Sequence, residues 1–198
     1  MRVGFIFECG PDGPDLKVVK NLAERILSDI EFEPATLDNK GRLMNECADA
    51  AEALLTIQKC ERVFIIWDLI PPDRDACRKE ECDYILEQLR ARRLPLDRII
   101  LVCIEQELES WLIADGRALS NLLSTATHQV NIPDTRRPDQ KRKPKKALNK
   151  IFREKRGWFY VDRDFAGSIV SRIPDFNRLK KSESFKRFYE KLSGNQLR

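Results

Sequence analysis

The sequence predicts an α/β protein with a mostly parallel sheet, helices on both faces of that sheet, and a helical extension at the C-terminus. Four short predicted strands, three of them apolar runs rich in strand-forming residues, alternate with longer segments in which apolar residues recur at helical spacing. Helices between successive strands indicate crossover connections, which join parallel strands. A chain of 198 residues with 42% hydrophobic residues can bury a core of this kind.

The first part of the chain contains all four predicted strands. Three of them are short apolar runs followed directly by an acidic residue, as expected for strands buried on both faces. The predicted strands are residues 3–7, 32–37, 63–67 and 99–104. The segments after them carry apolar residues three and four positions apart, which is typical of amphipathic helices. The predicted helices are residues 15–29, 42–59, 74–92 and 107–123, with a glycine- and proline-rich loop at 9–14 and a turn at 39–41.

The composition changes after residue 123. Residues 124–146 are polar and basic and contain three prolines, so we expect a loop or lid there. Helical patterns return in residues 145–154, 163–172 and 183–192. We therefore divide the chain into an α/β core over residues 1–125, a basic loop or lid over 126–146, and a helical extension over 147–198 that packs on the core.

Composition argues against several classes of protein. No stretch approaches the ~18 apolar residues of a membrane span, and the N-terminus has no signal-peptide pattern, so we expect a soluble cytoplasmic protein without a membrane partner. The six cysteines show no pairing pattern, which favours free thiols in a reducing compartment. A single histidine, His128, argues against a histidine-rich zinc site and against catalytic arrangements that use a second histidine.

Common phosphate and nucleophile motifs are also missing from the sequence. Neither a Gly-x-x-x-x-Gly-Lys loop nor a Gly-x-Gly-x-x-Gly motif follows the first predicted strand. Cys9 lies next to a predicted helix start, a position that can lower the pKa of a thiol. No arginine follows Cys9 at phosphatase-like spacing, so a cysteine nucleophile is disfavoured.

Acidic residues follow the core strands directly. Glu8 follows the first predicted strand, Asp68 follows the third, and Glu105 follows the fourth. Because ligands of open parallel sheets bind where the carboxyl ends of the strands meet, these acids can gather there and repel one another unless a cation neutralises them. Carboxylates without histidine or clustered thiols suit Mg²⁺ or Mn²⁺. Each acid could alternatively solvate a loop or cap a helix, as we expect for Asp75.

Two of these positions carry a resemblance to the Toprim domain, a Rossmann-like fold shared by topoisomerases, DnaG-type primases and OLD-family nucleases. Its first glutamate lies in a glycine-containing loop, as in Phe7-Glu8-Cys9-Gly10-Pro11-Asp12-Gly13, and Trp67-Asp68-Leu69-Ile70 is similar to its Asp-x-Asp motif. The chain resembles more closely a small Toprim-like family of unknown function related to RloB-type proteins of anti-phage systems. That resemblance is carried by three segments, residues 107–115 (ELESWLIAD), 143–148 (KPKKAL) and 179–185 (LKKSESF).

The resemblance implies phosphodiester hydrolysis by a Mg²⁺- or Mn²⁺-dependent endonuclease that acts as an anti-phage effector and works with a separately encoded ATPase. It implies that Glu8 is a general base or metal ligand and that Asp68 is a metal ligand. Further ligands would be Asp73, Glu105 and Glu109. Ile70 departs from the pattern because it replaces the second aspartate, and Asp73 or Asp75 could compensate.

Two other functions remain open from the sequence. Ile70 favours a catalytically degenerate module that binds nucleic acid or a partner protein without cutting. The loop containing Gly10 and Gly13 could instead hold the phosphate of a regulatory nucleotide. Glu109 and Asp115 match the family segment, but six residues apart they point about 120° away from each other on a straight helix, so they cannot share a site without a bend.

A basic segment favours a nucleic-acid partner independently of the resemblance. Residues 136–156 contain eleven lysines and arginines against two acids. The candidate nucleic-acid-binding residues are Arg137, Lys141, Arg142, Lys143, Lys145 and Lys146. The alternatives are a solvated loop or a docking surface for an acidic partner. Trp158, Phe159 and Tyr160 follow at once; they could stack on unpaired bases, but we expect them to be buried against the sheet.

Overall fold

The computed structural model describes residues 1–69 and 78–197. The chain forms two compact units, Met1–Cys103 and Ile104–Arg198, which we call the N-terminal unit and the C-terminal unit. Each is described by itself below. The division at residues 125 and 146 that the composition suggested, and the packing of the extension on the core, stay predictions.

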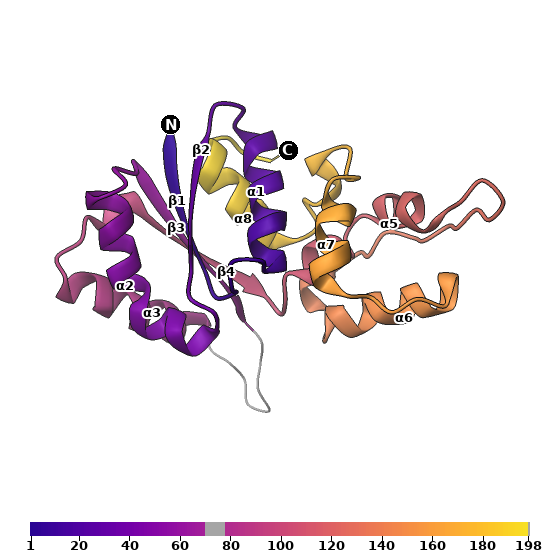
Figure 1. Cartoon of the computed structure of the whole chain (residues 1–198), viewed down its shortest axis with the longest axis horizontal. Coiled ribbons are helices and arrows are strands. Elements are labelled where there is room, and N and C mark those ends of the chain that lie inside the picture. Colours follow the sequence, from indigo (N-terminus) through magenta and orange to yellow (C-terminus); the bar gives the residue numbers. More distant parts are fainter. Residues whose placement is uncertain (70–77, 198) are drawn as a thin grey trace. The chain divides into compact units, whose positions relative to one another are not determined.

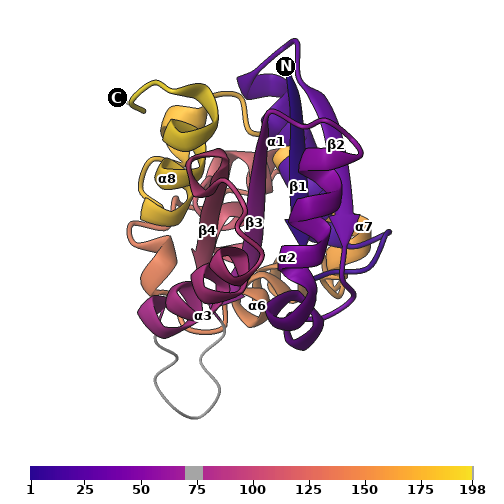
Figure 2. The same cartoon turned by 90° about the vertical axis from the view of Figure 1, so that its left-hand side faces the viewer.

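The N-terminal unit is built on a four-stranded parallel sheet, which confirms the predicted α/β class. The strands are β1 (Arg2–Phe7), β2 (Glu31–Thr36), β3 (Arg62–Leu69) and β4 (Ile99–Glu105), which runs on into the C-terminal unit. Their order across the sheet is β2-β1-β3-β4, as Figure 2 shows. In the register of the central pair, Phe7 of β1 lies opposite Ile66 of β3.

Helices cover both faces of this sheet. They are α1 (Pro14–Ile26), α2 (Lys40–Thr56) and α3 (Arg78–Ala91), with a short 3-10 helix η1 (Leu96–Arg98) before β4. Figures 1 and 2 show α2 and α3 on one face and α1 on the other. Along α2, Leu43, Cys47, Ala51 and Leu54 are buried at helical spacing, and their burial fixes the orientation of the helix.

Alternation along the strands sorts the core into two layers. Ile6, Ile65 and Trp67 belong to the apolar cluster that also contains buried residues of α2 and α3. The intervening Phe5 stacks with Phe64, at 5.3 Å between ring centroids, and with Phe32, at 4.3 Å. Because successive side chains of a strand point to opposite faces, this aromatic stack lies on the side of the sheet that α1 covers.

The C-terminal unit contains helices and loops. Its elements are α4 (Glu109–Leu112), α5 (Gly116–Leu123), η2 (Pro138–Gln140), α6 (Pro144–Arg156), α7 (Asp162–Val170), η3 (Phe176–Arg178) and α8 (Glu183–Ser193). The fully buried Trp111 organises its core and packs against Phe185 and Phe188, with ring centroids 5.4 and 5.5 Å away. The indole Nε1 of Trp111 donates a hydrogen bond of 2.8 Å to the hydroxyl of Ser184.

One predicted helix is interrupted. The sequence predicted a single helix over residues 107–123, but α4 ends at Leu112 and α5 begins at Gly116. Asp115 caps α5 by accepting hydrogen bonds from the backbone of Arg117 and Ala118. Gly116 is required here because a Cβ atom would lie 2.2 Å from the carbonyl oxygen of Ile132. The chain therefore bends between Glu109 and Asp115, and such a bend is the condition under which these two residues could share a site.

Smaller differences concern helix ends and thiols. The predicted turn at residues 39–41 is the start of α2, where the Asn39 side chain accepts a hydrogen bond of 3.0 Å from the backbone of Arg42. Cys9, Cys47, Cys60, Cys82 and Cys103 are free thiols, as predicted, and Cys77 lies outside the described residues. Within residues 1–69 and 78–197, no helix has the length and apolar character needed to cross a bilayer.

Candidate functional site

The strand order creates a switch point in the N-terminal unit. From β1 the chain crosses through α1 to β2 on one side, and it then returns through α2 to β3 on the other side of β1. Ligands of open parallel sheets bind outside the carboxyl ends of the two strands where the order reverses. Glu8 directly follows β1, and Asp68 is the penultimate residue of β3. The predicted acids therefore lie at the ends of these two strands.

Glu8 and Asp68 are brought into direct contact. The backbone N–H of Asp68 donates a hydrogen bond of 2.9 Å to Oε1 of Glu8, although the residues are 60 positions apart. The contact fixes the Glu8 carboxylate beside the end of β3. Both side chains are half-buried, so they are partly shielded and still reachable from solvent.

The environment of Glu8 favours its protonated form. Burial raises the pKa of Glu8 to about 7, and the negative charges of Asp15 and Glu81 act in the same direction. The hydrogen bond from Asp68 and the positive charge of Lys40 oppose this rise. A carboxyl group with a pKa near neutrality can accept and release a proton at the pH of the cell, which is the property required of a general base.

Lys40 brings a positive charge to the same edge of the sheet. Its Nζ donates a hydrogen bond of 2.9 Å to the carbonyl oxygen of Asp68 and forms an ion pair of 2.7 Å with Glu81. The other oxygen of Glu81 accepts a hydrogen bond of 2.7 Å from the indole Nε1 of Trp67. Sequence reasoning identified neither Lys40 nor Glu81, because their proximity depends on how α2 and α3 pack on the sheet.

The loop between β1 and α1 is tightly folded. The backbone N–H of Gly13 donates to the carbonyl oxygen of Gly10 at 2.9 Å, and a Cβ atom on Gly13 would lie 2.4 Å from the Cys9 side chain. Only glycine fits that approach. Burial, together with the charge of Asp15, raises the pKa of the Cys9 thiol to about 12. The thiol is therefore protonated at neutral pH, which agrees with the absence of a cysteine nucleophile.

The remaining predicted ligands divide between the undescribed segment and the C-terminal unit. Asp73 lies outside the described residues, as do Ile70 and Asp75. Glu105 and Glu109 belong to the C-terminal unit. Across residues 1–69 and 78–197, no three or more histidine, cysteine, aspartate or glutamate side chains are close enough together to hold a metal ion. The carboxylate metal site stays a prediction.

In the C-terminal unit, the acidic side chains are bound by neighbouring groups. Arg187 forms an ion pair of 3.1 Å with Glu105. The hydroxyl of Tyr160 lies 3.3 Å from Oε1 of Glu109, whose side chain is almost completely buried. The backbone N–H of Lys145 donates a hydrogen bond of 3.1 Å to Glu107. These contacts connect the starts of α4 and α6.

Lys145 lies among three acids. Its ammonium group pairs with Asp162 at the start of α7. Burial alone would lower the pKa of Lys145, but the bond to Asp162 and the charges of Glu109 and Glu107 outweigh it and raise the pKa.

Two residues near this cluster have left-handed backbones without being glycine. They are Gln106, at φ 73°, and Lys143, at φ 55°. They immediately precede Glu107 and α6, so the backbone is strained on both sides of the contact between Glu107 and Lys145.

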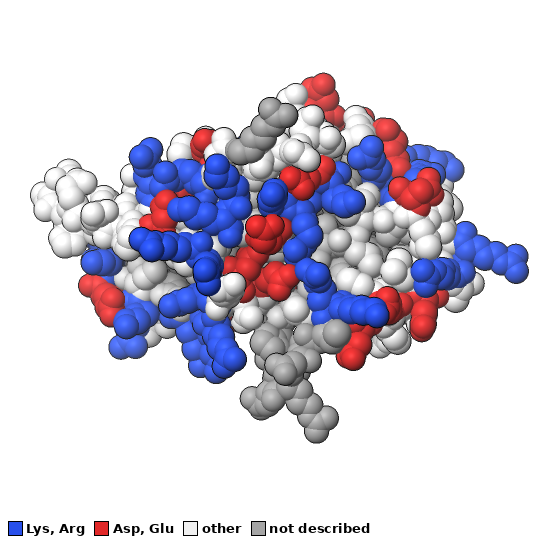
Figure 3. All heavy atoms as spheres, turned by 180° about the vertical axis from the view of Figure 1, so that it is seen from behind, with Lys and Arg blue, Asp and Glu red and all other residues white. Residues whose placement is uncertain are grey.

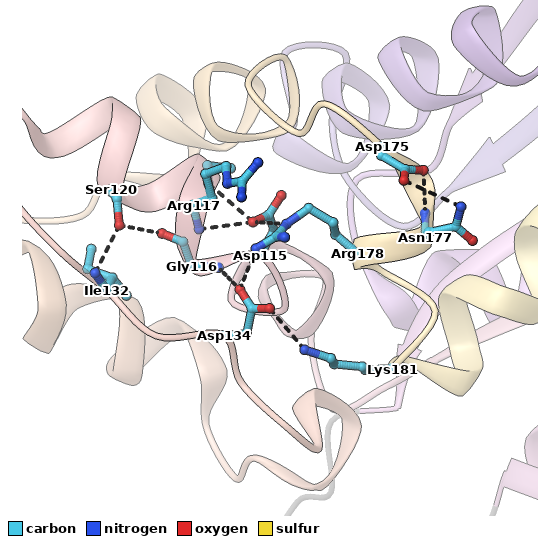
Figure 4. Close-up of polar contacts among 11 residues, drawn as sticks. Asp115, Gly116, Arg117, Ser120, Ile132, Asp134, Asp175, Asn177, Arg178 and Lys181 are labelled. Carbon is cyan, nitrogen blue, oxygen red and sulfur yellow. Dashed lines mark hydrogen bonds and ion pairs between the residues drawn. The ribbon is translucent and has the colours of Figure 1, made fainter.

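A second polar network surrounds Asp115, as Figure 4 shows. Asp115 is fully buried, and its Oδ1 accepts a hydrogen bond of 2.7 Å from Nε of Arg178. Nη2 of Arg178 also binds Asp134 at 2.8 Å, and Asp134 pairs with Lys181 at 3.0 Å. Asp134 further accepts a hydrogen bond of 3.0 Å from the backbone of Gly116. This network anchors the loop after α5 and has a structural role.

The basic segment is exposed. All six predicted nucleic-acid-binding residues are solvent-accessible: Arg137, Lys141, Arg142, Lys143, Lys145 and Lys146. Figure 3 shows lysine and arginine side chains gathered over the part of the C-terminal unit that contains α6 and the preceding loop. The loop is fixed at two points, because Asp139 accepts hydrogen bonds from Ser182 and Ser184 while Asp134 holds Arg178 and Lys181.

The aromatic residues after α6 differ from expectation. Tyr160 is buried, as predicted, but Trp158 is 43% exposed and Phe159 is 65% exposed. The prediction of burial was therefore wrong for these two. Gly157, with φ 70°, ends α6 in a left-handed cap that turns the chain sharply. The two rings after this turn are left in solvent.

Comparison with known proteins gives one family. A family model described as a domain of unknown function (DUF4276) matches residues 15–193, so the chain belongs to that family. The match contains Asp68 and the whole C-terminal unit up to residue 193, and it begins after Glu8. No curated protein and no solved structure matches the chain.

Proposed function

We propose that this DUF4276 protein is a nuclease of the Toprim type that depends on a divalent metal ion and hydrolyses phosphodiesters at the end of its sheet. The observation that carries the proposal is the contact between Glu8 and Asp68 at the switch point between β1 and β3. The raised pKa of Glu8, near 7, supports a role in proton transfer.

Two residues at this edge carry ligand atoms of the kind that a hard cation takes. Glu8 and Asp68 offer carboxylate oxygens, which are the ligands that Mg²⁺ and Mn²⁺ prefer. A carboxyl whose pKa is raised by burial and by neighbouring acids is one that a nearby cation would stabilise in its charged form. When bound, such an ion lowers the pKa of its water and neutralises phosphate charge. In this arrangement, Asp68 would hold the ion and Glu8 would accept a proton from water.

Two further groups support a phosphate substrate. Lys40 places a positive charge within 2.9 Å of the Asp68 carbonyl, where it can attract a phosphate oxygen. The exposed basic segment supplies the electrostatic affinity for a polynucleotide backbone. The resemblance to RloB-type proteins further suggests an anti-phage role and a separately encoded ATPase as partner, and both belong to the proposal.

The test is a cleavage assay on single-stranded DNA, double-stranded DNA and RNA with Mg²⁺ or Mn²⁺. Glu8→Ala and Asp68→Ala should both abolish cleavage, whereas Glu24→Ala, which removes an exposed acid of α1, should leave it unchanged. Cleavage that survives in both site variants would show that the activity resides elsewhere.

A second candidate function is a catalytically inactive module that binds nucleic acid or a partner protein. Lys40 favours it, because its ammonium group pairs with Glu81 and bonds to the end of β3 and so already supplies a positive charge beside these acids. Titration calorimetry with Mn²⁺ separates the two functions. A nuclease binds the ion in a manner that Glu8→Ala abolishes, whereas the inactive module shows no heat that depends on Glu8.

A further inference from the structure

We infer that α6 and the residues that follow it bind an unpaired nucleic-acid strand, with bases stacked on Phe159 and Trp158. We call this the α6 surface and define it by Lys146, Lys150, Arg153, Arg156, Trp158 and Phe159. The inference rests on the proposed function for its substrate, a polynucleotide, and specifies that the strand is single. All of these residues belong to the C-terminal unit.

The helix presents its cations on an outward face. Pro144, Leu148 and Phe152 are buried four residues apart, so one face of α6 packs into the unit. The ring of Phe152 makes edge contacts with Tyr160, at 5.4 Å, and with Phe165, at 4.9 Å. The start and end of the helix are thus anchored, and its basic side chains point to solvent from a rigid support.

The α6 surface includes a shallow hollow that is open to solvent. The hollow has a volume of about 620 Å³ and is lined by Lys146, Asn149, Lys150, Arg153 and Glu154. Three of the five lining side chains are cations. An anionic group that is itself extended, such as a phosphate with its sugar, fits this combination of charge and space.

The two exposed rings are held in place by arginines. The Arg156 guanidinium lies 4.7 Å from the centre of the Trp158 ring, and the Arg153 guanidinium lies 5.5 Å from the centre of the Phe159 ring. Trp158 also stacks on Phe165, with ring centroids 6.3 Å apart. Phe159 is 65% exposed. Most of its ring therefore remains open to a ligand, although the Arg153 guanidinium lies over it.

This combination selects an unpaired strand over other anionic partners. The phosphates of such a strand pair with the cations, and its base faces stack on the aromatic rings. Stacking on aromatic side chains is a general feature of single-strand binding. A duplex hides its base faces within its own stack, so it would use the cations alone. An acidic protein segment would match the charge but would gain little from two planar rings beside arginines.

Binding is tested with the full chain carrying Glu8→Ala and with EDTA present, so that no cleavage or metal site contributes. The probes are fluorescein-labelled oligo(dT) and oligo(rU) of about 15 nucleotides and a DNA duplex of equal charge, measured by fluorescence anisotropy. Trp67 and Trp111 are buried, so quenching of tryptophan emission reports on Trp158. Poly-glutamate serves as the competitor that mimics an acidic protein.

The inference predicts tighter binding of at least one single strand than of the duplex, with quenching of Trp158. Phe159→Ala should weaken single-strand binding by ~5-fold or more, and Val161→Ala, which trims a neighbouring exposed residue, should not. Lys150→Ala should weaken binding and lower the slope of log affinity against log salt by ~0.7, whereas Lys191→Ala on α8 should do neither. Both aromatic and basic substitutions lie on the surface, so thermal melting should be unchanged.

Equal affinity for the duplex, insensitivity to Phe159→Ala, or equally strong competition by poly-glutamate would each overturn the inference, as would a lack of binding to every probe. The result is separate from the fate of the proposed nuclease. Single-strand binding without any Glu8-dependent cleavage would uphold the α6 surface and contradict the nuclease. Glu8-dependent cleavage without the expected single-strand binding would uphold the nuclease and contradict the α6 surface.

Discussion

Glu8 of the N-terminal unit and two acids of the C-terminal unit, Asp134 and Asp162, experience opposite electrostatic surroundings. Burial raises the pKa of Glu8 in the N-terminal unit to about 7. Burial would by itself also raise the pKa of Asp134 and of Asp162 in the C-terminal unit, yet both values are lowered. The difference comes from Lys181 and Lys145, whose ammonium groups bind these two carboxylates.

This contrast separates structural acids from acids available for chemistry. A carboxylate held by a lysine or arginine has its charge compensated within the fold, and it contributes to stability as long as the pair remains intact. Glu8 accepts one backbone hydrogen bond, and burial together with the charges of Asp15 and Glu81 outweighs that bond and the opposing charge of Lys40, so that the pKa of Glu8 is raised. Groups whose pKa is perturbed in this way cluster at functional sites, which supports assigning chemistry to the end of the sheet.

The largest expected effect is on catalysis. If Glu8 accepts a proton during hydrolysis, Glu8→Gln should lower the cleavage rate by ~100- to 10,000-fold while preserving shape. Asp134→Asn, in the structural network, should reduce stability and leave the rate of the folded protein within a small factor. The cleavage rates of both variants are measured at a temperature where both are folded. An equal loss of rate in the two variants would show that Glu8 is no more important for catalysis than Asp134.

The next effect is on stability. Asp115 is fully buried, caps α5 and pairs with Arg178, so Asp115→Ala should destabilise the C-terminal unit by about 3 kcal/mol. Hydrogen exchange at the amides of α5 measures the change directly. The matched control is Glu46→Ala, which breaks an exposed ion pair with Arg42 and should have no measurable effect.

A third effect depends on pH. Glu8 releases its proton near pH 7 in the folded protein, compared with its ordinary value of 4.5 when the chain is unfolded. The folded state therefore binds more protons between these values, and stability falls as the pH rises through this window. Glu8→Gln should match the wild type at about pH 4 and exceed its stability by about 1–3 kcal/mol at about pH 8, in EDTA.

Urea unfolding at several pH values measures that difference, and added Mn²⁺ sharpens it. An ion bound by Glu8 and Asp68 stabilises only the folded wild type, so the advantage of Glu8→Gln at high pH should shrink as Mn²⁺ is added. A constant difference at every pH would show that the proton affinity of Glu8 is ordinary, and it would remove the electrostatic contrast between the units.

The N-terminal unit follows rules that can be applied to a sequence. Apolar runs of five or six residues located β1, β3 and β4, and alternation with helices predicted the parallel sheet. The neighbourhood of Glu8 and Asp68 followed from the rule that the carboxyl ends of parallel strands share an edge. Lys40 and Glu81 escaped prediction because no local pattern shows which helix start will lie beside which strand end.

The C-terminal unit has no comparable rule. Its helices are short, and its contacts join residues far apart, such as Trp111 with Ser184 and Asp115 with Arg178. Two of the segments that carried the resemblance, residues 107–115 and 179–185, meet in the contact between Trp111 and Ser184, although residue types alone did not reveal the geometry. The exposure of Trp158 and Phe159 was missed because aromatic residues after a helix usually become core, and here the left-handed Gly157 turns them outward.

The smallest expected effect compares two tyrosine hydroxyls. Tyr160 donates to the buried Glu109, whereas Tyr84 in the N-terminal unit bonds to Asn45 on the surface. Tyr160→Phe leaves a buried carboxylate with one donor fewer and should cost about 1–2 kcal/mol, and Tyr84→Phe should cost less because water replaces the lost partner. Hydrogen exchange in each unit measures both changes. Equal costs would mean that the buried hydrogen bond from Tyr160 to Glu109 contributes no more to stability than the exposed bond from Tyr84 to Asn45.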